Sequence, residues 1–306
     1  MKTVSVVIPT KNAGELFKKT LDGIKKQSYA GKVELVVVDS GSTDSTIALA
    51  RDYGAAVFSI PPDEFDHGLT RNKGIENSSG EIIVLLSQDA IPGDASLIHN
   101  FVAAFDDERV AGAYGRQLPR EEADLITKRN LKNWFTGRDQ KEVRWIDDWS
   151  KYNAQSPMER YFFCNFDNVC SAVRRSVWQD VQFHASDFGE DIDWAQRVLE
   201  LGWKIAYIPA AHVIHSHARS IQYEFLRNRL CHRTLYRQFG IAAVPSLKLV
   251  AIAALVTTWS DWKYVLRQKI HPWELIKTVI SIPLLNLASV YGQYKGLRSG
   301  QSTEKP

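Results

Sequence analysis

The sequence has few cysteines, little net charge and no clear phosphate-binding loop. Its three cysteines, Cys164, Cys170 and Cys231, show no CxxC spacing. This pattern excludes a disulfide framework and a zinc site, and it indicates buried thiols in a reducing compartment. A net charge of +3 over 306 residues is too small to predict binding to nucleic acid.

Signals for export and for a membrane-spanning helix are also weak. The chain enters a strand pattern at Val4, directly after its first residues, so we expect no signal peptide and a cytoplasmic protein. Two apolar stretches, 247–259 and 273–291, are interrupted by polar residues. Neither is the clean run of about 18 apolar residues that is typical of a transmembrane helix.

The first strand is followed by Pro9-Thr10-Lys11-Asn12, which matches neither GxxxxGK[ST] nor GxGxxG. The segment therefore excludes a Walker-type nucleotide site and gives little support to dinucleotide redox chemistry. It is also a poor match to the basic, glycine-rich loop expected of a nucleotidyltransferase.

Residues 1–115 alternate between strand and helix signals. Near-continuous apolar strands are predicted at 4–8, 33–38, 55–60 and 81–86, with helical spacing between them. This alternation predicts a parallel sheet covered on both faces. Ligands of such sheets bind at the carboxyl ends of the strands.

Three of these strands end in residues that should share that edge: Pro9 and Thr10, then Asp39, and then Ser87, Gln88 and Asp89. Asp39 could accept a hydrogen bond from a nucleobase or a ribose, although turn and capping chemistry explains it equally well. A carboxylate such as Asp89 suits a divalent cation that bridges phosphate oxygens. A single carboxylate supplies too few ligands for a metal ion, so His215 or His217 is a candidate for a further ligand.

Two further segments place charge at predicted helix starts. Arg71 and Lys73 could meet a diphosphate, whereas an exposed charged helix is the simpler alternative. Glu190 and Asp191 open a helix, where we expect the dipole to keep the pKa of a carboxylate low. An ionised Asp191 could be a general base, and helix capping is the alternative.

The carboxyl-terminal stretches 247–259 and 273–291 are flanked by Trp, Tyr, Lys and Arg. This arrangement suits a pair of helices lying in the headgroup region of a membrane. A small helical domain or a homodimer interface would give the same pattern.

In their order along the chain, these motifs resemble family 2 glycosyltransferases of the GT-A fold. The resemblance covers residues 2–217. It rests on the ordered set Pro9-Thr10-Lys11-Asn12, Asp39 with Ser42-Thr43-Asp44, Thr70-Arg71-Asn72-Lys73-Gly74, Asp89 and Glu190-Asp191. Segments 67–72 and 87–90 are similar to the bacterial rhamnosyltransferase branch, which uses dTDP-L-rhamnose and builds O-antigen, capsule or other cell-wall polysaccharide.

The resemblance implies a catalytic GT-A domain over 1–217, with a Rossmann-like, mostly parallel sheet flanked by helices. Its nucleotide-binding half would span 1–115 and its acceptor half 116–217. Residues 218–306 would form a helical extension that contacts a membrane surface or a second copy of the chain.

The resemblance also implies roles for single residues. The nucleotide-binding set would be Pro9, Thr10, Asp39, Ser42, Arg71, Lys73 and Gln88. Asp89 and His215 would hold Mg²⁺ or Mn²⁺, and Asp191 would be the base of an inverting reaction. Glu190 and Trp194 would lie beside the donor or acceptor sugar. Ser87 departs from the family pattern, because it stands where the DXD motif has its first aspartate.

We therefore expect an inverting glycosyltransferase that moves L-rhamnose from dTDP-L-rhamnose onto a polyprenyl-diphosphate-linked saccharide. It would act as a peripheral protein on the inner face of the cell membrane, without nucleic acid as a partner. The alternatives are a UDP- or GDP-sugar donor on the same fold, or a non-catalytic nucleotide-binding homologue.

Overall fold

The computed structural model describes residues 1–302, which fall into two compact units. The first, here called the sheet unit, contains Met1–Glu121, Leu131–Ala154 and Phe162–Ser216. The second, here called the helical unit, contains Glu122–Asn130, Gln155–Tyr161 and the chain from His217 onward. Two short segments from the middle of the chain thus join the carboxyl-terminal helices, a feature that a single boundary at residue 217 does not capture.

The strands of the described residues are β1 Val4–Thr10, β2 Val33–Asp39, β3 Ala56–Ser59, β4 Ile82–Leu86, β5 Ile91–Pro92, β6 Val110–Leu118, β7 Glu142–Arg144, β8 Cys170–Arg174 and β9 Lys204–Ile214. They form one sheet in the order β3-β2-β1-β4-β8-β6-β9-β5, with β7 also paired to β9. The first four strands are parallel, as predicted. Because β8 runs antiparallel to both β4 and β6, the sheet as a whole is mixed.

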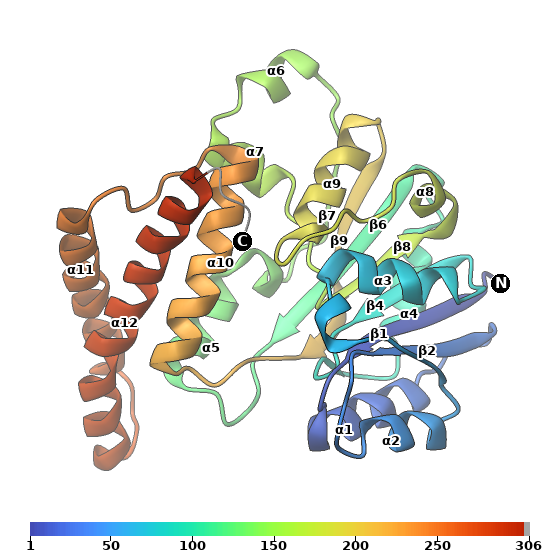
Figure 1. The fold of residues 1–306 in the computed structure, drawn as a ribbon, viewed down its shortest axis with the longest axis horizontal. Coiled ribbons are helices and arrows are strands. Elements are labelled where there is room, and N and C mark those ends of the chain that lie inside the picture. The colour runs from blue at the N-terminus through green and yellow to red at the C-terminus, as the bar shows by residue number, and fades with distance from the viewer. Residues whose placement is uncertain (303–306) are drawn as a thin grey trace. The chain divides into compact units, whose positions relative to one another are not determined.

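The sheet unit also contains the helices α1 Gly14–Lys25, α2 Thr46–Asp52, α3 His67–Glu76, α4 Leu97–Ala104, α6 Trp149–Ala154, α8 Arg175–Asp180 and α9 Glu190–Glu200. Figure 1 shows α1 and α2 on one side of the amino-terminal strands and α3 on the other.

Strand β1 is buried on both faces because its side chains alternate between two layers of helices. Val6 and Ile8 belong to the same core cluster as Phe17 of α1. On the opposite face, a Cβ added to Gly74 of α3 would overlap Val7, so α3 packs directly on β1. Two-sided burial explains why these strands read as continuous apolar runs in the sequence.

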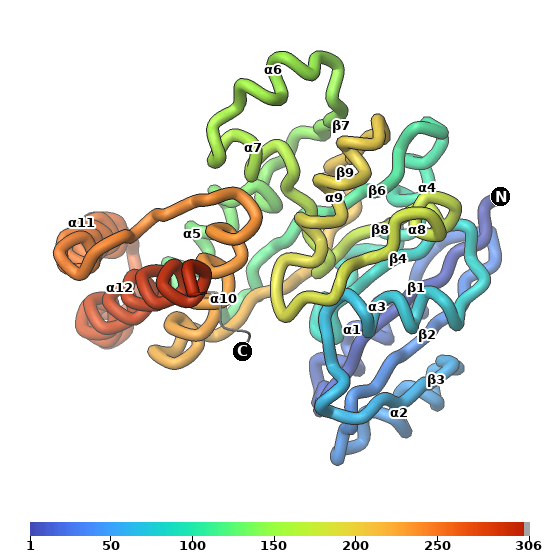
Figure 2. Tube along the Cα trace, turned by 45° about the horizontal axis from the view of Figure 1, so that its top comes forward, coloured from blue at the N-terminus to red at the C-terminus, as the bar shows by residue number. Residues whose placement is uncertain are grey.

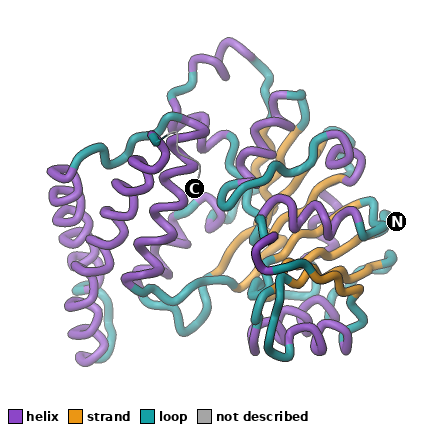
Figure 3. Tube along the Cα trace, in the orientation of Figure 1, coloured by secondary structure: helices purple, strands orange, loops and turns teal. Residues whose placement is uncertain are grey.

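The helical unit is built on three long helices, α10 Ile221–Phe239, α11 Leu247–Val265 and α12 Pro272–Gln301, which lie side by side in Figure 2. Figure 3 shows this unit as helix and loop, with the strands confined to the sheet unit. Two shorter helices, α5 Leu125–Asn133 and α7 Pro157–Phe163, each contribute residues to both units.

Helices α10 and α12 approach closely at two glycines of α12. A Cβ added to Gly292 would overlap the carbonyl oxygen of Phe225, and one added to Gly296 would overlap that of Arg229. Glycines one turn apart therefore let the two backbones come into contact.

Helix α12 is the one helix in residues 1–302 that is long and apolar enough, by length and composition, to cross a membrane. A core helix of a soluble protein would pass the same test, but only 22% of the apolar stretch of α12 is buried. Among the cysteines, Cys164 and Cys170 are buried and Cys231 is partly buried.

Candidate active site

The carboxyl ends of β1 and β2 are joined through the carboxylate of Asp39. Oδ1 accepts hydrogen bonds from the hydroxyls of Thr10 at 2.9 Å and Ser42 at 2.5 Å. Oδ2 accepts from the backbone N–H groups of Gly41 at 3.0 Å and Ser42 at 2.8 Å. Asp39 is fully buried, and these four donors use the acceptor positions of a carboxylate. It therefore shapes the loop after β2, and a nucleobase would have to replace one of these donors to bind it.

Gln88 ties the end of β4 to the segment after β1. Its Oε1 accepts from the N–H of Lys11 at 2.8 Å, and its Nε2 donates to the carbonyl of Lys11 at 3.3 Å. Pro9 lies opposite Val38 in the parallel register and is partly buried. The structure thus brings Pro9, Thr10, Ser42 and Gln88 to one edge of the sheet, as the positions of the strand ends predict.

Asp89 follows β4 and is contacted on each of its carboxylate oxygens. Nη2 of Arg120 donates to Oδ2 at 2.8 Å, and Nε2 of His215 lies 3.5 Å from Oδ1. The sheet brings these groups together, because β6 and β9 are neighbours and the N–H of His215 donates to the carbonyl of Leu118. Arg120 and His215 therefore come from two adjacent strand ends.

Asp89 and His215 are arranged in a way that fits a divalent cation. Two ligands about 2.2 Å from one ion lie roughly 3.0–3.6 Å apart, which matches the separation of Oδ1 and Nε2. Arg120 occupies the other oxygen and leaves Oδ1 facing the imidazole. His217, the other candidate, is the first residue of the helical unit.

Asp191 is the second residue of α9, which follows Gly189, whose φ of +85° lies in the left-handed region that glycine tolerates. Its Oδ2 accepts from the backbone N–H of Asn168 at 3.1 Å. The residue keeps partial solvent access. Its partial burial, which removes water from the carboxylate, raises its pKa well above the usual range of an aspartate, and the charges of Glu190 and Asp167 raise it further.

This raised pKa corrects the expectation that the helix dipole keeps the pKa of Asp191 low. Desolvation and two neighbouring carboxylates outweigh the dipole. A carboxylate of this kind holds a proton more strongly than a solvated aspartate. The shift suits a general base, which is most effective when its pKa lies near the working pH.

Glu190 and Arg71 are placed beside Asp191 as partners of each other. Nη1 of Arg71 lies 2.9 Å from Oε1 of Glu190 and also donates to the carbonyl of His67 at 2.9 Å. Nδ2 of Asn168 donates to Oε1 of Glu190 at 3.1 Å. In this arrangement the guanidinium of Arg71 is engaged with an acid, while Lys73 of the same helix is partly buried.

Trp194 lies in the core, where a sugar cannot contact it. The side chain is fully buried, and its indole N–H donates to the carbonyl of Val181 at 2.7 Å. The ring packs against Phe166 and Phe183, with centroid separations of 5.3 and 5.5 Å. Trp194 therefore supports the helix that carries Asp191.

The sequence analysis does not predict four residues that lie next to the predicted site residues: Gln117, Arg120, Asp167 and Asn168. The first two lie at or just after the end of β6, and the other two precede β8. Polar residues after an apolar strand were the signal that identified Asp39 and Asp89. The same signal exists after 110–115, where Gln117 and Arg120 follow an apolar run.

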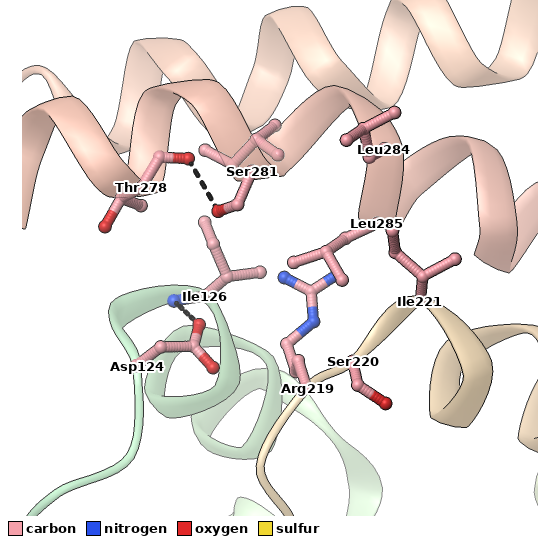
Figure 4. Close-up of a pocket in the computed structure, with 10 residues that line it drawn as sticks. Asp124, Ile126, Arg219, Ser220, Ile221, Thr278, Ser281, Leu284 and Leu285 are labelled. Carbon is pink, nitrogen blue, oxygen red and sulfur yellow. Dashed lines mark hydrogen bonds between the residues drawn. The ribbon is translucent and has the colours of Figure 1, made fainter.

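A separate hollow of about 290 Å³ lies within the helical unit (Figure 4). Thr278, Ser281 and Leu285 of α12 line it, together with Ile126 and Arg219. Among the described residues, none of the predicted site residues lines this hollow. Its volume is at the lower limit of small-molecule sites.

Comparison with known proteins places these features in a family. Residues 5–180 match the family model described as Glycosyl transferase family 2. The chain is 33% identical over 258 residues to the O-antigen chain rhamnosyltransferase RfbN of Salmonella typhimurium, covering 81% of this chain and 79% of that protein. It is 31% identical over 260 residues to the O-antigen chain rhamnosyltransferase WbaN of Salmonella anatum, covering 82% and 79%.

Solved structures with similar folds include two proteins in complex with nucleotide sugars. The mannosyltransferase PcManGT from Pyrobaculum calidifontis, in complex with GDP-Man and Mn²⁺, has a TM-score of 0.60 and 18% identity, covering 94% of this chain and 86% of that chain. TarS 1–349 of S. aureus, in complex with UDP-GlcNAc, has a TM-score of 0.56 and 14% identity, covering 98% and 91%. At these identities the likeness concerns the fold.

Proposed function

Because this chain belongs to glycosyl transferase family 2 and has the GT-A fold, it is a glycosyltransferase, and we propose that it transfers L-rhamnose from dTDP-L-rhamnose. The proposal of rhamnose is supported by the similarity of this chain to two O-antigen chain rhamnosyltransferases, each over 79% of its length. The acceptor in this proposal is a polyprenyl-diphosphate-linked saccharide, and the product is a cell-surface polysaccharide.

The proposed reaction is a single in-line displacement. The acceptor hydroxyl oxygen forms a bond to the anomeric carbon while Asp191 takes the proton from that hydroxyl. The bond between the anomeric carbon and the diphosphate breaks, and its electron pair leaves with dTDP. The configuration at the anomeric carbon inverts. The partial solvent access and raised pKa of Asp191 support its role as the base.

The charge of the leaving diphosphate has to be neutralised at the sheet edge. A divalent cation, Mg²⁺ or Mn²⁺, would supply Lewis-acid stabilisation of that charge when bound. Asp89 and His215 would hold it through Oδ1 and Nε2, and the guanidinium of Arg120 adds a fixed positive charge beside them.

The nucleotide is assigned to the edge formed by Pro9, Thr10, Asp39, Ser42 and Gln88. Lys73 remains a candidate for the diphosphate. Arg71 is bound to Glu190, so in this proposal it acts mainly by holding the acidic pair next to the reacting hydroxyl. Glu190 is itself 5% exposed, which limits direct contact with a sugar.

The helical unit presents an apolar surface that we assign to the inner face of the cell membrane. The exposed side of α12 carries large apolar residues at intervals of three or four positions: Trp273, Ile276, Ile280, Leu284, Leu287 and Tyr291. Exposed apolar side chains on α11 include Ile252, Leu255, Val256 and Trp259. Exposed lysines and an arginine lie at the ends of these stretches and, for one of them, within the second: Lys248, Lys263, Lys277, Lys295 and Arg298.

Apolar stripes bordered by cations are typical of helices that lie in the headgroup region of an anionic membrane. Leu284 belongs to this exposed face and also lines the hollow of the helical unit. Docking at the membrane would bring the enzyme to its lipid-linked acceptor and raise the local concentration of that substrate.

A donor panel tests the proposed function. Nucleotide release would be measured from dTDP-rhamnose, UDP-hexoses and GDP-mannose, with a membrane lipid extract as acceptor and with or without Mn²⁺. Release from dTDP-rhamnose alone is expected. Release from another donor would overturn the choice of sugar and keep the family chemistry. Binding of nucleotide without release from any donor would indicate a non-catalytic homologue.

A further inference from the structure

A line of polar contacts inside the sheet unit leads from Asp167 to Asp89. Nε2 of Gln117 donates to Oδ2 of Asp167 at 2.8 Å. Oε1 of the same amide lies 2.9 Å from Nδ1 of His215, and Nε2 of His215 lies 3.5 Å from Oδ1 of Asp89. Gln117 and His215 are only 6% and 5% exposed, so these contacts are shielded from water.

The chemistry of the groups sets the direction of each hydrogen bond. An ionised carboxylate only accepts, so the amide of Gln117 must turn its NH₂ group toward Asp167. The amide oxygen then faces His215 and can only accept, so Nδ1 of His215 must carry a proton. In a neutral imidazole the other nitrogen, Nε2, is then unprotonated.

This tautomer determines which form of Nε2 faces Asp89. An unprotonated Nε2 directs its lone pair toward the space beside Oδ1 of Asp89, where a cation can use both atoms. The opposite tautomer would present an N–H there and could not bind a metal through Nε2. Hydrogen bonds to the outer nitrogen of a histidine ligand commonly set its tautomer and orientation.

We propose that Gln117 and Asp167 are positioning residues that fix His215 with its Nε2 lone pair toward Asp89 and so pre-form the divalent cation site. This inference rests on the assignment of a cation to Asp89 and His215 in the proposed function. Gln117 and Asp167 would act on the cation through His215.

The segment that contains Asp167 also contacts the proposed base. Asp167 anchors the amide of Gln117, and the N–H of the next residue, Asn168, donates to Asp191. One short segment before β8 therefore helps to position the groups on the cation side and on the acceptor side of the site.

The test is the affinity for Mn²⁺ with dTDP present and no acceptor, measured by electron paramagnetic resonance. Gln117→Met keeps the length of the side chain and removes both hydrogen bonds. We expect it to weaken Mn²⁺ binding by about 10–100-fold, as changes in outer contacts of metal ligands do. Gln182→Met, at an exposed position of the same unit, is the matched control and should bind Mn²⁺ like the unchanged protein.

A second variant separates orientation from packing. Asp167→Asn keeps the shape of the side chain, but its amide can donate as well as accept, so the Gln117 amide is no longer forced into one orientation. We expect weaker Mn²⁺ binding here too. Unchanged Mn²⁺ affinity in a folded Gln117→Met protein would overturn the positioning role.

The position of the proton on His215 is a further test, because it would not depend on Gln117 if Gln117 only stabilised the fold. Nitrogen-15 NMR of the unchanged protein should show a proton on Nδ1 of His215. An unprotonated Nδ1 would contradict the proposal even if Gln117→Met failed to fold. If the unchanged protein does not bind Mn²⁺ at all, the cation assignment of the proposed function fails. If it binds Mn²⁺ and Gln117→Met binds equally well, only the present inference fails.

Discussion

Arg71 and Glu190 form a buried ion pair, in which Nη1 lies 2.9 Å from Oε1 and the two side chains are 8% and 6% exposed. Glu190 precedes the proposed base, Asp191. The pair therefore does two things: it compensates a buried carboxylate, and it places a positive charge near Asp191 that partly offsets the rise in its pKa.

Removal of Arg71 should destabilise the protein and alter the titration of Asp191. Arg71→Met would leave Glu190 buried without its cation, at a cost of about 3–5 kcal/mol in the free energy of unfolding. The pKa of Asp191 should rise, so the increase of activity with pH should shift to higher pH. Urea unfolding and a pH–rate profile measure the two effects. Arg51→Met, at an exposed position, should change neither.

How much of this site the sequence could predict depends on the range of the interactions involved. The edge containing Thr10, Asp39 and Asp89 was predictable, because parallel strands place their carboxyl ends together. The pairing of Arg71 with Glu190 was not, since it joins residues far apart in the sequence through the packing of α3 near α9. For the same reason the burial of Trp194 could not be read from its position after Asp191.

The strands also differ in whether a local sequence pattern predicts them. The apolar runs of β1, β2 and β4 were recognisable because both of their faces are buried. Strand β8 is short, and no local sequence pattern indicates whether it pairs parallel or antiparallel with its neighbours. The long β6 contains Gly112 and Gly115, which weaken its strand signal and lie where added side chains would overlap Trp194 and the backbone of Ala211.

Replacement of the proposed base should separate stability from activity. In the folded protein Asp191 has a raised pKa, so the folded state holds a proton that the unfolded state has already lost. The stability from this proton is present at low pH and is lost as pH rises from the usual aspartate range through the raised value.

Asp191→Asn should therefore increase thermal stability at neutral pH while reducing turnover by about 10²–10⁴-fold. Differential scanning calorimetry at several pH values and a rate assay check the two effects. Asp52→Asn, at an exposed position, is the control. A destabilised Asp191→Asn protein at neutral pH would argue against the raised pKa.

The exposed face of α12 should determine membrane binding. Replacing Ile280 and Leu284 by Asp removes two apolar contacts and should lower partitioning onto anionic vesicles by on the order of tenfold for each residue. Vesicle sedimentation measures this, and Leu201→Asp, at another exposed leucine, which belongs to the sheet unit, is the control. Unchanged vesicle binding with a loss of dimer in ultracentrifugation would identify a homodimer interface instead.

The contact between α10 and α12 should be sensitive to side-chain size at Gly296. A valine there would overlap the backbone of Arg229 and push the helices apart. We expect Gly296→Val to destabilise the helical unit by about 1–3 kcal/mol. Ala251→Val, at an exposed position of α11, should have a much smaller effect in urea unfolding. Equal stabilities would show that the helices do not need this close approach.

Inverting rhamnosyl transfer is tested most directly by following labelled rhamnose from dTDP-rhamnose to a lipid-linked acceptor, with the configuration of the new linkage determined by NMR. We expect a rhamnosylated lipid whose anomeric configuration is opposite to that of the donor, and almost no product with Asp191→Asn. Retention of configuration, or near-normal transfer by Asp191→Asn, would contradict it.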